Sequence, residues 1–463
     1  MASSRRKPGV ACSVEPRHVA SKRTLNATNL EALGAEALAA LLIEVSSGNA
    51  VIQRRLRLAL ASAEGVEGAA QEVRKRLQAI SRSTTTVDAR RRKALITDLE
   101  MQLQAITGPI AGSNPAQAFE LLLRFLELSD DVLDRCWDST GAVFAVFERA
   151  VQQLGPLAVA ARIEAETLAQ HADELLEENS HEQYDGLVPA LKDALGDWGL
   201  KLLESYRRQR GIGDGAEVLR QIAVARGDVE GFLRQFDGEE LRWRDTAASV
   251  AAQLLTWGRA EQALEILDGA TEEPDDPQDS QWHDARIAVV DALGRHNEAQ
   301  DMRWHWFSQT LSIPHLRDHL THLDAYEDVE VEERALQLAE AFPDSLLGLQ
   351  FLVEWPSLSR AARHVLAHED EWEGDEHTVL IAGVERLSAD HPLAATLLLR
   401  AMVFFVLWTK WAKRYRVTAE QLRSCEQLAA RIHDWQGHRD HQAYRTWLQD
   451  CFETRQGFWK LLT

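Results

Sequence analysis

Cysteine is scarce in this chain. Only four occur in 463 residues, far apart and without a Cys-x-x-Cys pair: Cys12, Cys136, Cys425 and Cys451. This spacing excludes a disulfide framework and a zinc-ribbon ligand set. Scattered cysteines are typical of proteins from a reducing compartment, so we expect a cytoplasmic location.

Long hydrophobic runs are also missing. The longest apolar stretch covers residues 393–408 and is interrupted by Arg400, so it is too short to span a bilayer comfortably. The first 23 residues are basic and polar, and no apolar segment typical of secretory signals follows them. We therefore expect no membrane partner, and we predict that residues 393–408 form a buried helix.

The sequence lacks the short motifs that assemble catalytic or cofactor-binding groups. It has no Gly-x-x-x-x-Gly-Lys phosphate loop, no His-Glu-x-x-His zinc motif, no Gly-x-Ser-x-Gly nucleophile turn and no EF-hand loop. These absences predict a protein that is not an enzyme, with no catalytic residue and no cofactor.

Strand-like alternation is nearly absent as well. Alanine, leucine, glutamate and arginine, which favour helices, dominate the chain. The pattern predicts an all-α fold in three parts. These are a disordered basic tail over residues 1–25, an N-terminal helical domain over 26–210, and a tetratricopeptide-like α-solenoid with a C-terminal helical bundle over 211–463.

Individual residues predict where some helices begin and end. Asn29 is a good N-cap and is predicted to open the first helix, and the fourth helix is predicted to end near residues 107–109, which read Thr-Gly-Pro. The apolar residues 457–462 are predicted to dock as a cap, because the end of a solenoid must cover its last hydrophobic face.

A repeated phrase supports the solenoid prediction. Residues 254–263 read LLTWGRAEQA and residues 290–299 read VDALGRHNEA, so Gly294 follows Gly258 by 36 residues. A fainter copy surrounds Gly227. A two-helix repeat of ~34 residues is typical of tetratricopeptide-like arrays. Such arrays present extended surfaces for partners.

The repeat half is also rich in tryptophan, a residue that anchors interfaces. We therefore predict an intracellular scaffold that binds a protein or peptide partner. The predicted contact residues are Trp257, Trp282, Trp304, Trp306 and Arg400. Arg400 stands inside the apolar run, so we also predict that it is buried and paired with a carboxylate or with backbone carbonyl groups.

Charge is unevenly distributed. The first 100 residues carry a net charge of +7 and the remaining 363 carry −28. One basic cluster suggests nucleic-acid contact as an alternative function, through Arg74, Lys75, Arg76, Arg82, Arg90, Arg91, Arg92 and Lys93. No aromatic residue precedes Phe119, so this region has no platform for stacking bases, and a solvated helix face also explains the cluster.

Three histidines share one predicted helical face. His315, His319 and His322 are spaced by four and three residues, which suits a zinc ion or another borderline metal. The competing interpretation is an amphipathic helix edge, because leucines at 316, 320 and 323 form the adjacent core stripe.

Several segments together resemble a family of uncharacterised bacterial helical proteins, known only as a domain of unknown function. They are residues 29–34, 53–58, 76–83, 138–141, 391–402, 425–429 and 458–459. The resemblance runs from residue 29 onward and implies a helical fold without a known activity. Similar helical regions accompany SWIM-type zinc-finger proteins. The Cys-x-Cys and Cys-x-His ligand pairs of that finger are missing here, so the resemblance implies no zinc function.

Overall fold

The computed structural model describes residues 24–210, 215–271, 280–324 and 326–462. Within these ranges the regular elements are helices and there is no β-strand, apart from an isolated parallel bridge between Val87 and Cys136. The prediction of an all-α, repeat-like fold is confirmed. The predicted tail, residues 1–25, lies outside the described residues except for its last two positions.

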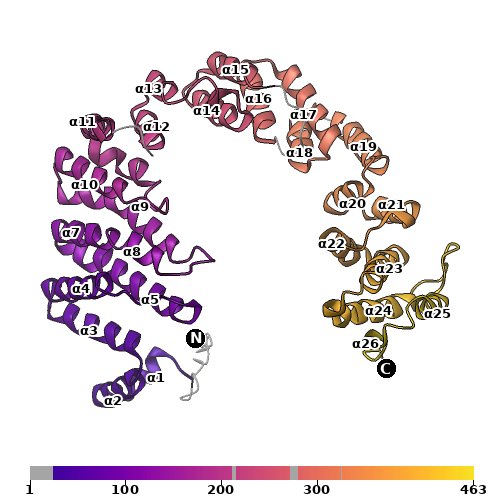
Figure 1. Cartoon of the computed structure of the whole chain (residues 1–463), viewed down its shortest axis with the longest axis horizontal. Coiled ribbons are helices and arrows are strands. Elements are labelled where there is room, and N and C mark those ends of the chain that lie inside the picture. The colour runs from indigo at the N-terminus through magenta and orange to yellow at the C-terminus, as the bar shows by residue number, and fades with distance from the viewer. Residues whose placement is uncertain (1–23, 211–214, 272–279, 325, 463) are drawn as a thin grey trace, which may run out of the picture. The chain divides into compact units, whose positions relative to one another are not determined.

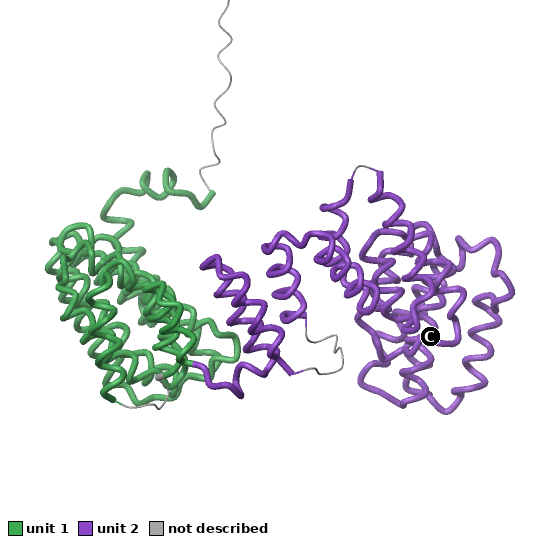
Figure 2. The backbone as a smooth tube through the Cα atoms, turned by 90° about the horizontal axis from the view of Figure 1, so that it is seen from above, with its two compact units in different colours: residues 1–235 green, residues 236–463 purple. Residues whose placement is uncertain are grey.

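The chain divides into two compact units, residues 1–235 and 236–463 (Figure 2). Each unit contains a hydrophobic core of its own. This division reflects which helices pack against one another. The predicted boundary between residues 210 and 211 rests on local sequence alone, and it remains a prediction.

Helices of the first unit follow one another with short connections (Figure 1). They are α1 (Ala27–Glu31), α2 (Ala35–Ser46), α3 (Ala50–Glu64), α4 (Val66–Ser81), α5 (Ala89–Ala105), the π-helical turn η1 (Ile106–Ile110), α6 (Ala111–Ser113), α7 (Pro115–Leu126), α8 (Ser129–Asp134), α9 (Phe144–Ala161), α10 (Ala165–Glu177), α11 (Leu187–Arg210), α12 (Gly215–Arg226) and α13 (Val229–Leu233).

Short polar side chains set the starts of several of these helices. Asp88 accepts hydrogen bonds from two backbone N–H groups in the first turn of α5. The prediction that Asn29 caps the first helix is wrong. Asn26 is the cap, and its side chain accepts the backbone N–H of Asn29 at 2.8 Å. Gly34, at φ +82°, then separates α1 from α2.

The helix predicted to end near residues 107–109 continues past them. Helix α5 runs through the π-helical turn η1 into α6, with Pro109 inside the turn. Proline lacks an N–H group, and a π turn locally rearranges the hydrogen-bond ladder around such a residue. Ile106 and Ile110 are both fully buried, so the turn keeps these side chains in the core.

Helices α9 and α11 approach each other closely at Gly155. A Cβ atom added to Gly155 would lie 2.0 Å from the carbonyl oxygen of Ala190. Leu154 and Leu191, on either side of this contact, are fully buried. The two helix backbones therefore touch at a position where only a hydrogen fits.

The second unit is a further succession of helices. They are η2 (Glu240–Arg242), α14 (Arg244–Thr256), α15 (Ala260–Asp268), α16 (Ser280–Ala292), α17 (His296–Thr310), α18 (Ile313–Thr321), α19 (Glu327–Glu340), α20 (Ser345–Glu354), α21 (Leu358–Ala367), η3 (Glu369–Glu371), α22 (His377–Leu387), α23 (Pro392–Trp408), η4 (Ala412–Arg414), α24 (Tyr415–Ala429), α25 (His441–Cys451) and α26 (Gln456–Trp459).

The repeated phrase forms two helical hairpins, as predicted. Gly258 turns α14 into α15 at φ +69°, and Gly294 turns α16 into α17 at φ +75°. Both conformations lie in the left-handed region that favours glycine. The fainter copy behaves in the same way, because Gly227 connects α12 to α13 at φ +68°.

Packing in this part of the second unit is mostly local in sequence. Helix α14 packs against α15 and α16, α16 packs against α17, and α17 packs against α18. Ala251, Leu254 and Ala263 are fully buried at the α14–α15 contact, where small side chains let the helices approach closely. Each hairpin thus covers the apolar face of its neighbour, which is the architecture of a solenoid.

Helix α23 is the predicted buried helix, and most of its side chains are inaccessible. Near the end of the chain, Phe458 on α26 is fully buried, with its ring centroid 5.8 Å from that of Tyr415. This contact confirms the predicted terminal cap. Among the described residues, no helix combines the length and apolar character needed to cross a bilayer.

Candidate binding pockets

Arg400 is a charged residue in the middle of the apolar helix α23. Only 6% of its surface is exposed. Its Nη1 atom donates a hydrogen bond of 2.8 Å to the backbone oxygen of Arg439. Its guanidinium carbon lies 4.3 Å from the ring centroid of Tyr444 and 4.9 Å from that of Trp435. The predictions of burial and of a carbonyl partner are confirmed, and no described carboxylate pairs with this side chain.

The positive charge of Arg400 is only weakly compensated. Burial lowers the pKa of Arg400, because the uncharged form loses less hydration. Burial also raises the pKa of Cys425 to about 12 and raises the pKa of Tyr444. Both neighbours are therefore uncharged at neutral pH. The Nε and Nη2 atoms of Arg400 have no hydrogen-bond partner among the described residues.

An aromatic pocket adjoins this arginine. It has a volume of about 650 Å³, and Arg400 lines it together with Trp372, Phe404, Trp408 and Trp447. Phe404 stacks on Trp408 and on Trp447, with ring centroids 6.0 and 5.8 Å apart. Trp408 is 68% exposed, so this wall is open to solvent. We call this site the Arg400 pocket.

Charged residues surround the apolar part of the Arg400 pocket. Glu369, Asp370 and Glu373 line it from the segment that follows α21, and Arg439 lines it from the connection before α25. Pockets of this size, with apolar walls and few polar groups, are typical of sites that hold a small ligand or an inserted side chain. The arginine favours an acceptor group inside, and the carboxylates favour a basic neighbour outside.

The predicted tryptophan contacts lie elsewhere in the second unit. Trp306 is 2% exposed, and its ring is stacked 3.6 Å from that of His283. Trp282 lies under the guanidinium groups of Arg244 and Arg286, at 4.7 and 5.3 Å. Each of these rings is therefore engaged within the unit.

Trp304 and Trp257 are half-buried. The guanidinium of Arg334 lies 4.5 Å from the ring centroid of Trp304. Trp257 follows the last residue of α14. Of the five predicted contact residues, only Arg400 lines the Arg400 pocket. A role in partner contact for the four tryptophans remains a prediction.

The three histidines of the predicted metal face have separate surroundings. His315 is buried, with Nδ1 2.7 Å from the Ser312 hydroxyl and Nε2 2.7 Å from Asp284. His319 is buried beside the ring of Trp304, whereas His322 is exposed and contacts the backbone oxygen of its own helical turn. Within the described residues, no group of three or more His, Cys, Asp or Glu side chains is arranged to hold a metal ion.

Buried histidines make the second unit sensitive to acid. Burial lowers the pKa of His319 and of His364 below the usual 6.5. Just below pH 6.5 the unfolded chain therefore binds more protons at these histidines than the folded chain does, and acid favours unfolding. Their contribution to stability is complete above pH 6.5 and is lost as the pH falls below that value. Each histidine changes the free energy of unfolding by at most about 1.4 kcal/mol per pH unit.

We expect urea denaturation of the second unit to shift to lower urea concentrations between pH 7.5 and 5.5. His364→Gln should make this pH dependence shallower. His305→Gln, at an exposed position of α17, is the matched control and should leave it unchanged. An identical pH dependence in wild type and His364→Gln would contradict the prediction.

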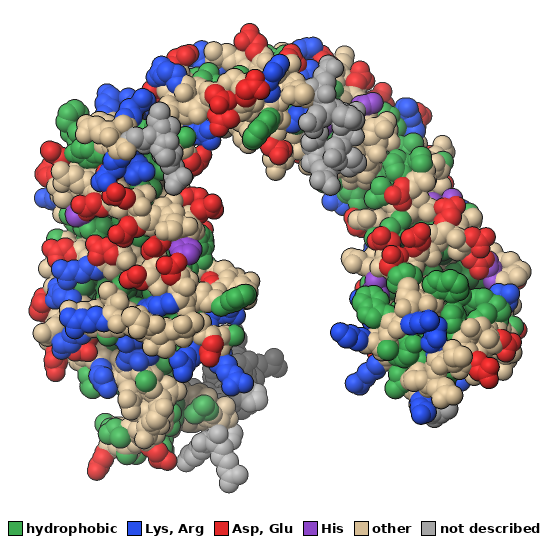
Figure 3. All heavy atoms as spheres, viewed as in Figure 1, with side chains coloured by type: hydrophobic (Ala, Val, Ile, Leu, Met, Phe, Trp, Pro, Cys, Tyr) green, Lys and Arg blue, Asp and Glu red, His purple; other side chains and the backbone are tan. Residues whose placement is uncertain are grey.

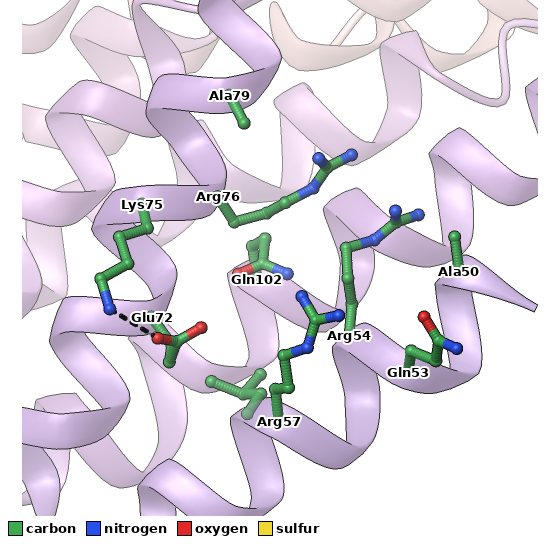
Figure 4. A pocket seen from close by; sticks show the side chains of 10 residues that line it. Ala50, Gln53, Arg54, Arg57, Glu72, Lys75, Arg76, Ala79 and Gln102 are labelled. Atoms are coloured by element: carbon green, nitrogen blue, oxygen red, sulfur yellow. Dashed lines mark hydrogen bonds and ion pairs between the residues drawn. The ribbon is translucent and has the colours of Figure 1, made fainter. Parts of the chain in front are cut away.

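A second pocket lies in the first unit, where α3, α4 and α5 meet (Figure 4). Asp98 of α5 is 1% exposed and lines an adjoining cavity rather than this one, but it contacts two of the arginines that line both. Its Oδ2 atom lies 3.1 Å from Nε of Arg54 and 2.8 Å from Nε of Arg76. Its Oδ1 atom accepts a hydrogen bond from Gln102 at 3.2 Å. Arg57 and Lys75 also line this cavity, which has a volume of about 310 Å³.

The structure separates the residues of the predicted basic cluster. Lys75 and Arg76 line this cavity, which we call the basic cavity, and Arg91 lines an adjoining one. Arg92 instead donates a hydrogen bond of 2.8 Å to the backbone oxygen of Trp137. The remaining members of the cluster line neither cavity; they are Arg74, Arg82, Arg90 and Lys93. Figure 3 shows Lys and Arg side chains gathered over these N-terminal helices.

Arg54 and Arg57 belong to this basic cavity but are not among the predicted basic residues. They stand three residues apart on α3, and that spacing places both side chains on one helical face. This spacing is enough to predict a basic face on α3. The proximity of that face to Arg76 depends on how α3 packs against α4 and is not visible in the sequence.

The model of a family of unknown function (DUF6880) matches residues 20–212 and 204–461. The chain belongs to this family. The predicted resemblance to a helical family of unknown function is therefore confirmed. Its bacterial origin and a link to SWIM-type proteins remain predictions.

No curated protein matches the chain significantly. One similar solved structure is described as a "circular tandem repeat protein with novel repeat topology and enhanced subunit contact surfaces". It is 15% identical, and the match covers 92% of this chain and 99% of that chain with a TM-score of 0.16.

Proposed function

We propose that this protein is a non-enzymatic, cytoplasmic scaffold that binds a protein or peptide segment in the Arg400 pocket. The observation that carries the proposal is a buried guanidinium beside an open aromatic wall. Stacked aromatic rings bury apolar groups well and supply the anchors of many interfaces. The cytoplasmic location is supported by the scattered cysteines.

The pocket also defines the chemistry of the segment. An apolar side chain fits between Phe404, Trp408 and Trp447. A carbonyl or carboxylate group of the segment is attracted toward Arg400, and basic residues before or after it are attracted toward Glu369 and Glu373. A segment with these three features binds better than a uniformly acidic one, which the carboxylates repel.

Selection of peptides from a random library against the full-length protein tests this proposal. We expect the selected peptides to share a large apolar residue with nearby basic residues. Trp408→Ala should weaken their binding about tenfold, because truncation of an aromatic anchor removes buried apolar contact.

Trp243→Ala provides the matched control. Trp243 is 68% exposed, as Trp408 is, but it does not line the Arg400 pocket, so its replacement should leave the affinity unchanged. Peptides that bind equally to wild type and Trp408→Ala, or a library that yields no binding peptide, would argue against the proposal.

A nucleic-acid-associated role is the second candidate, and the basic cavity is the observation that favours it. Binding through arginines and lysines weakens steeply as salt rises, because counterions are released from the phosphates. A gel shift with a steep salt dependence supports this role, and no shift at low salt removes it.

A further inference from the structure

We infer that the basic cavity is a binding site for a terminal phosphate group, held by Arg54, Arg57 and Arg76. This site lies in the first unit and is independent of the Arg400 pocket. Figure 4 shows the three guanidinium groups, from α3 and α4, around Gln102 of α5.

Charge in the basic cavity is incompletely neutralised. Arg54 and Arg76 share a single carboxylate, that of Asp98. Lys75 pairs with Glu72 at 2.9 Å, so these two charges cancel. Arg57 makes no ion pair or hydrogen bond with the described residues. Three guanidinium groups against one carboxylate leave two positive charges, which match the charge of a phosphate monoester near neutral pH.

Arg54 and Arg76 are held in place before any ligand arrives. Asp98 is buried and forms ion pairs with both guanidinium groups, and each of these two arginines keeps about a quarter of its side chain exposed. Arginine presents five N–H donors in a planar fork, so groups not used by Asp98 remain for an oxyanion. Burial lowers the pKa of Arg54, and the nearby charges of Arg76 and Arg57 act in the same direction. A bound anion relieves this repulsion.

An adjoining cavity extends the site. It has a volume of about 220 Å³, and Arg54 and Arg76 line both cavities. Its other polar groups include the side chains of Ser83, Thr85 and Arg91. Hydroxyl and guanidinium groups are frequent phosphate donors. A ligand with two linked phosphates therefore reaches donors in both cavities, and a ligand with one phosphate reaches fewer.

The two cavities have no described side chain on which a nucleobase could stack. None of the described residues that line them is aromatic, and recognition of unpaired bases depends on stacking against aromatic rings. The cavities therefore recognise the phosphate group and not the nucleobase of any nucleotide that carries it.

Calorimetric titration of the full-length protein with inorganic phosphate and with pyrophosphate tests the inference. We expect both anions to bind, pyrophosphate more tightly. Arg57→Gln should weaken binding about tenfold, because it removes a charged donor, and it should fold normally because Arg57 is exposed and unpaired. Arg55→Gln is the matched control: Arg55 is exposed on α3 but does not line either cavity.

A second arm identifies the source of the phosphate. An oligonucleotide with a 5′-phosphate that binds through Arg57, while the unphosphorylated strand does not, supports a nucleic-acid end as the ligand. Binding of the inorganic anions but of neither oligonucleotide supports a small phosphorylated compound. Binding of both oligonucleotides with equal affinity overturns the terminal-phosphate site in favour of backbone charge. Equal affinity of Arg57→Gln and wild type, or no binding of any of these ligands, also overturns it.

Discussion

Replacing Gly155 by alanine should lower the free energy of unfolding of the first unit by about 3 kcal/mol, which is large for a single methyl group. The added Cβ atom would lie 2.0 Å from the carbonyl oxygen of Ala190 and 3.1 Å from its carbonyl carbon. Both of these atoms belong to the backbone of α11, so no side-chain rotation relieves the clash. Helices α9 and α11 must move apart instead.

Separation of these helices disturbs a well-packed region. Leu154, Leu187 and Leu191 are fully buried around the contact. Interiors are packed as densely as organic crystals, so a shift of one helix opens gaps beside its neighbours. The lost van der Waals contact adds to the strain at Gly155.

Gly112→Ala is the matched control for this prediction. Gly112 is an exposed helical glycine with no atom within 4 Å of an added Cβ. Its replacement should be neutral or should stabilise the unit by up to about 1 kcal/mol, because alanine favours helix. Hydrogen exchange of the full-length protein, read from proteolytic peptides that cover residues 115–210, reports the stability of the first unit by itself. Equal protection in the two variants would contradict the close approach of α9 and α11.

Arg400→Glu should destabilise the second unit by about 4 kcal/mol, whereas Arg400→Met should remain within about 1.5 kcal/mol of wild type. The glutamate would place a negative charge against the backbone oxygen of Arg439 and the electron-rich faces of Tyr444 and Trp435. Each of these groups favours a cation and repels an anion.

Methionine has a shape similar to that of the arginine stem and carries no charge. The main cost of this substitution is that the backbone carbonyl of Arg439 loses its hydrogen-bond donor. This cost is offset because no charged guanidinium has to be buried. Urea denaturation followed by the fluorescence of the tryptophans in this unit measures both variants. Equal stability of the two variants would contradict the burial of position 400 against the Arg439 carbonyl and the two aromatic rings.

Features that depend on local sequence were predictable. Gly258 and Gly294 occupy the same place in a repeated phrase that predicts two-helix units, and both residues adopt positive φ between the two helices of their unit. The burial of Arg400 followed from the apolar residues on both sides of it. In each case the information lies within a few helical turns of the residue concerned.

Features that depend on packing between distant residues were not predictable. Asp98 meets Arg54, which is 44 residues earlier in the chain, and no sequence spacing indicates that α3 and α5 converge there. The Arg400 pocket similarly combines residues from α23 with Glu369 and Trp447.

Local competition between signals explains two other errors. Asn26 and Asn29 are equally good caps by residue type, and only the hydrogen bond between them shows which one is used. Pro109 usually marks the end of a helix, but here a π turn accommodates it and the helix continues.

The mostly local packing of α14 to α18 has a mechanical consequence. A force applied to the ends of this segment does not have to rupture one large interface at once, because each hairpin is held mainly by the next. Single-molecule stretching of the segment should therefore show stepwise extension at low force, one hairpin at a time. The segment should refold when the force is released.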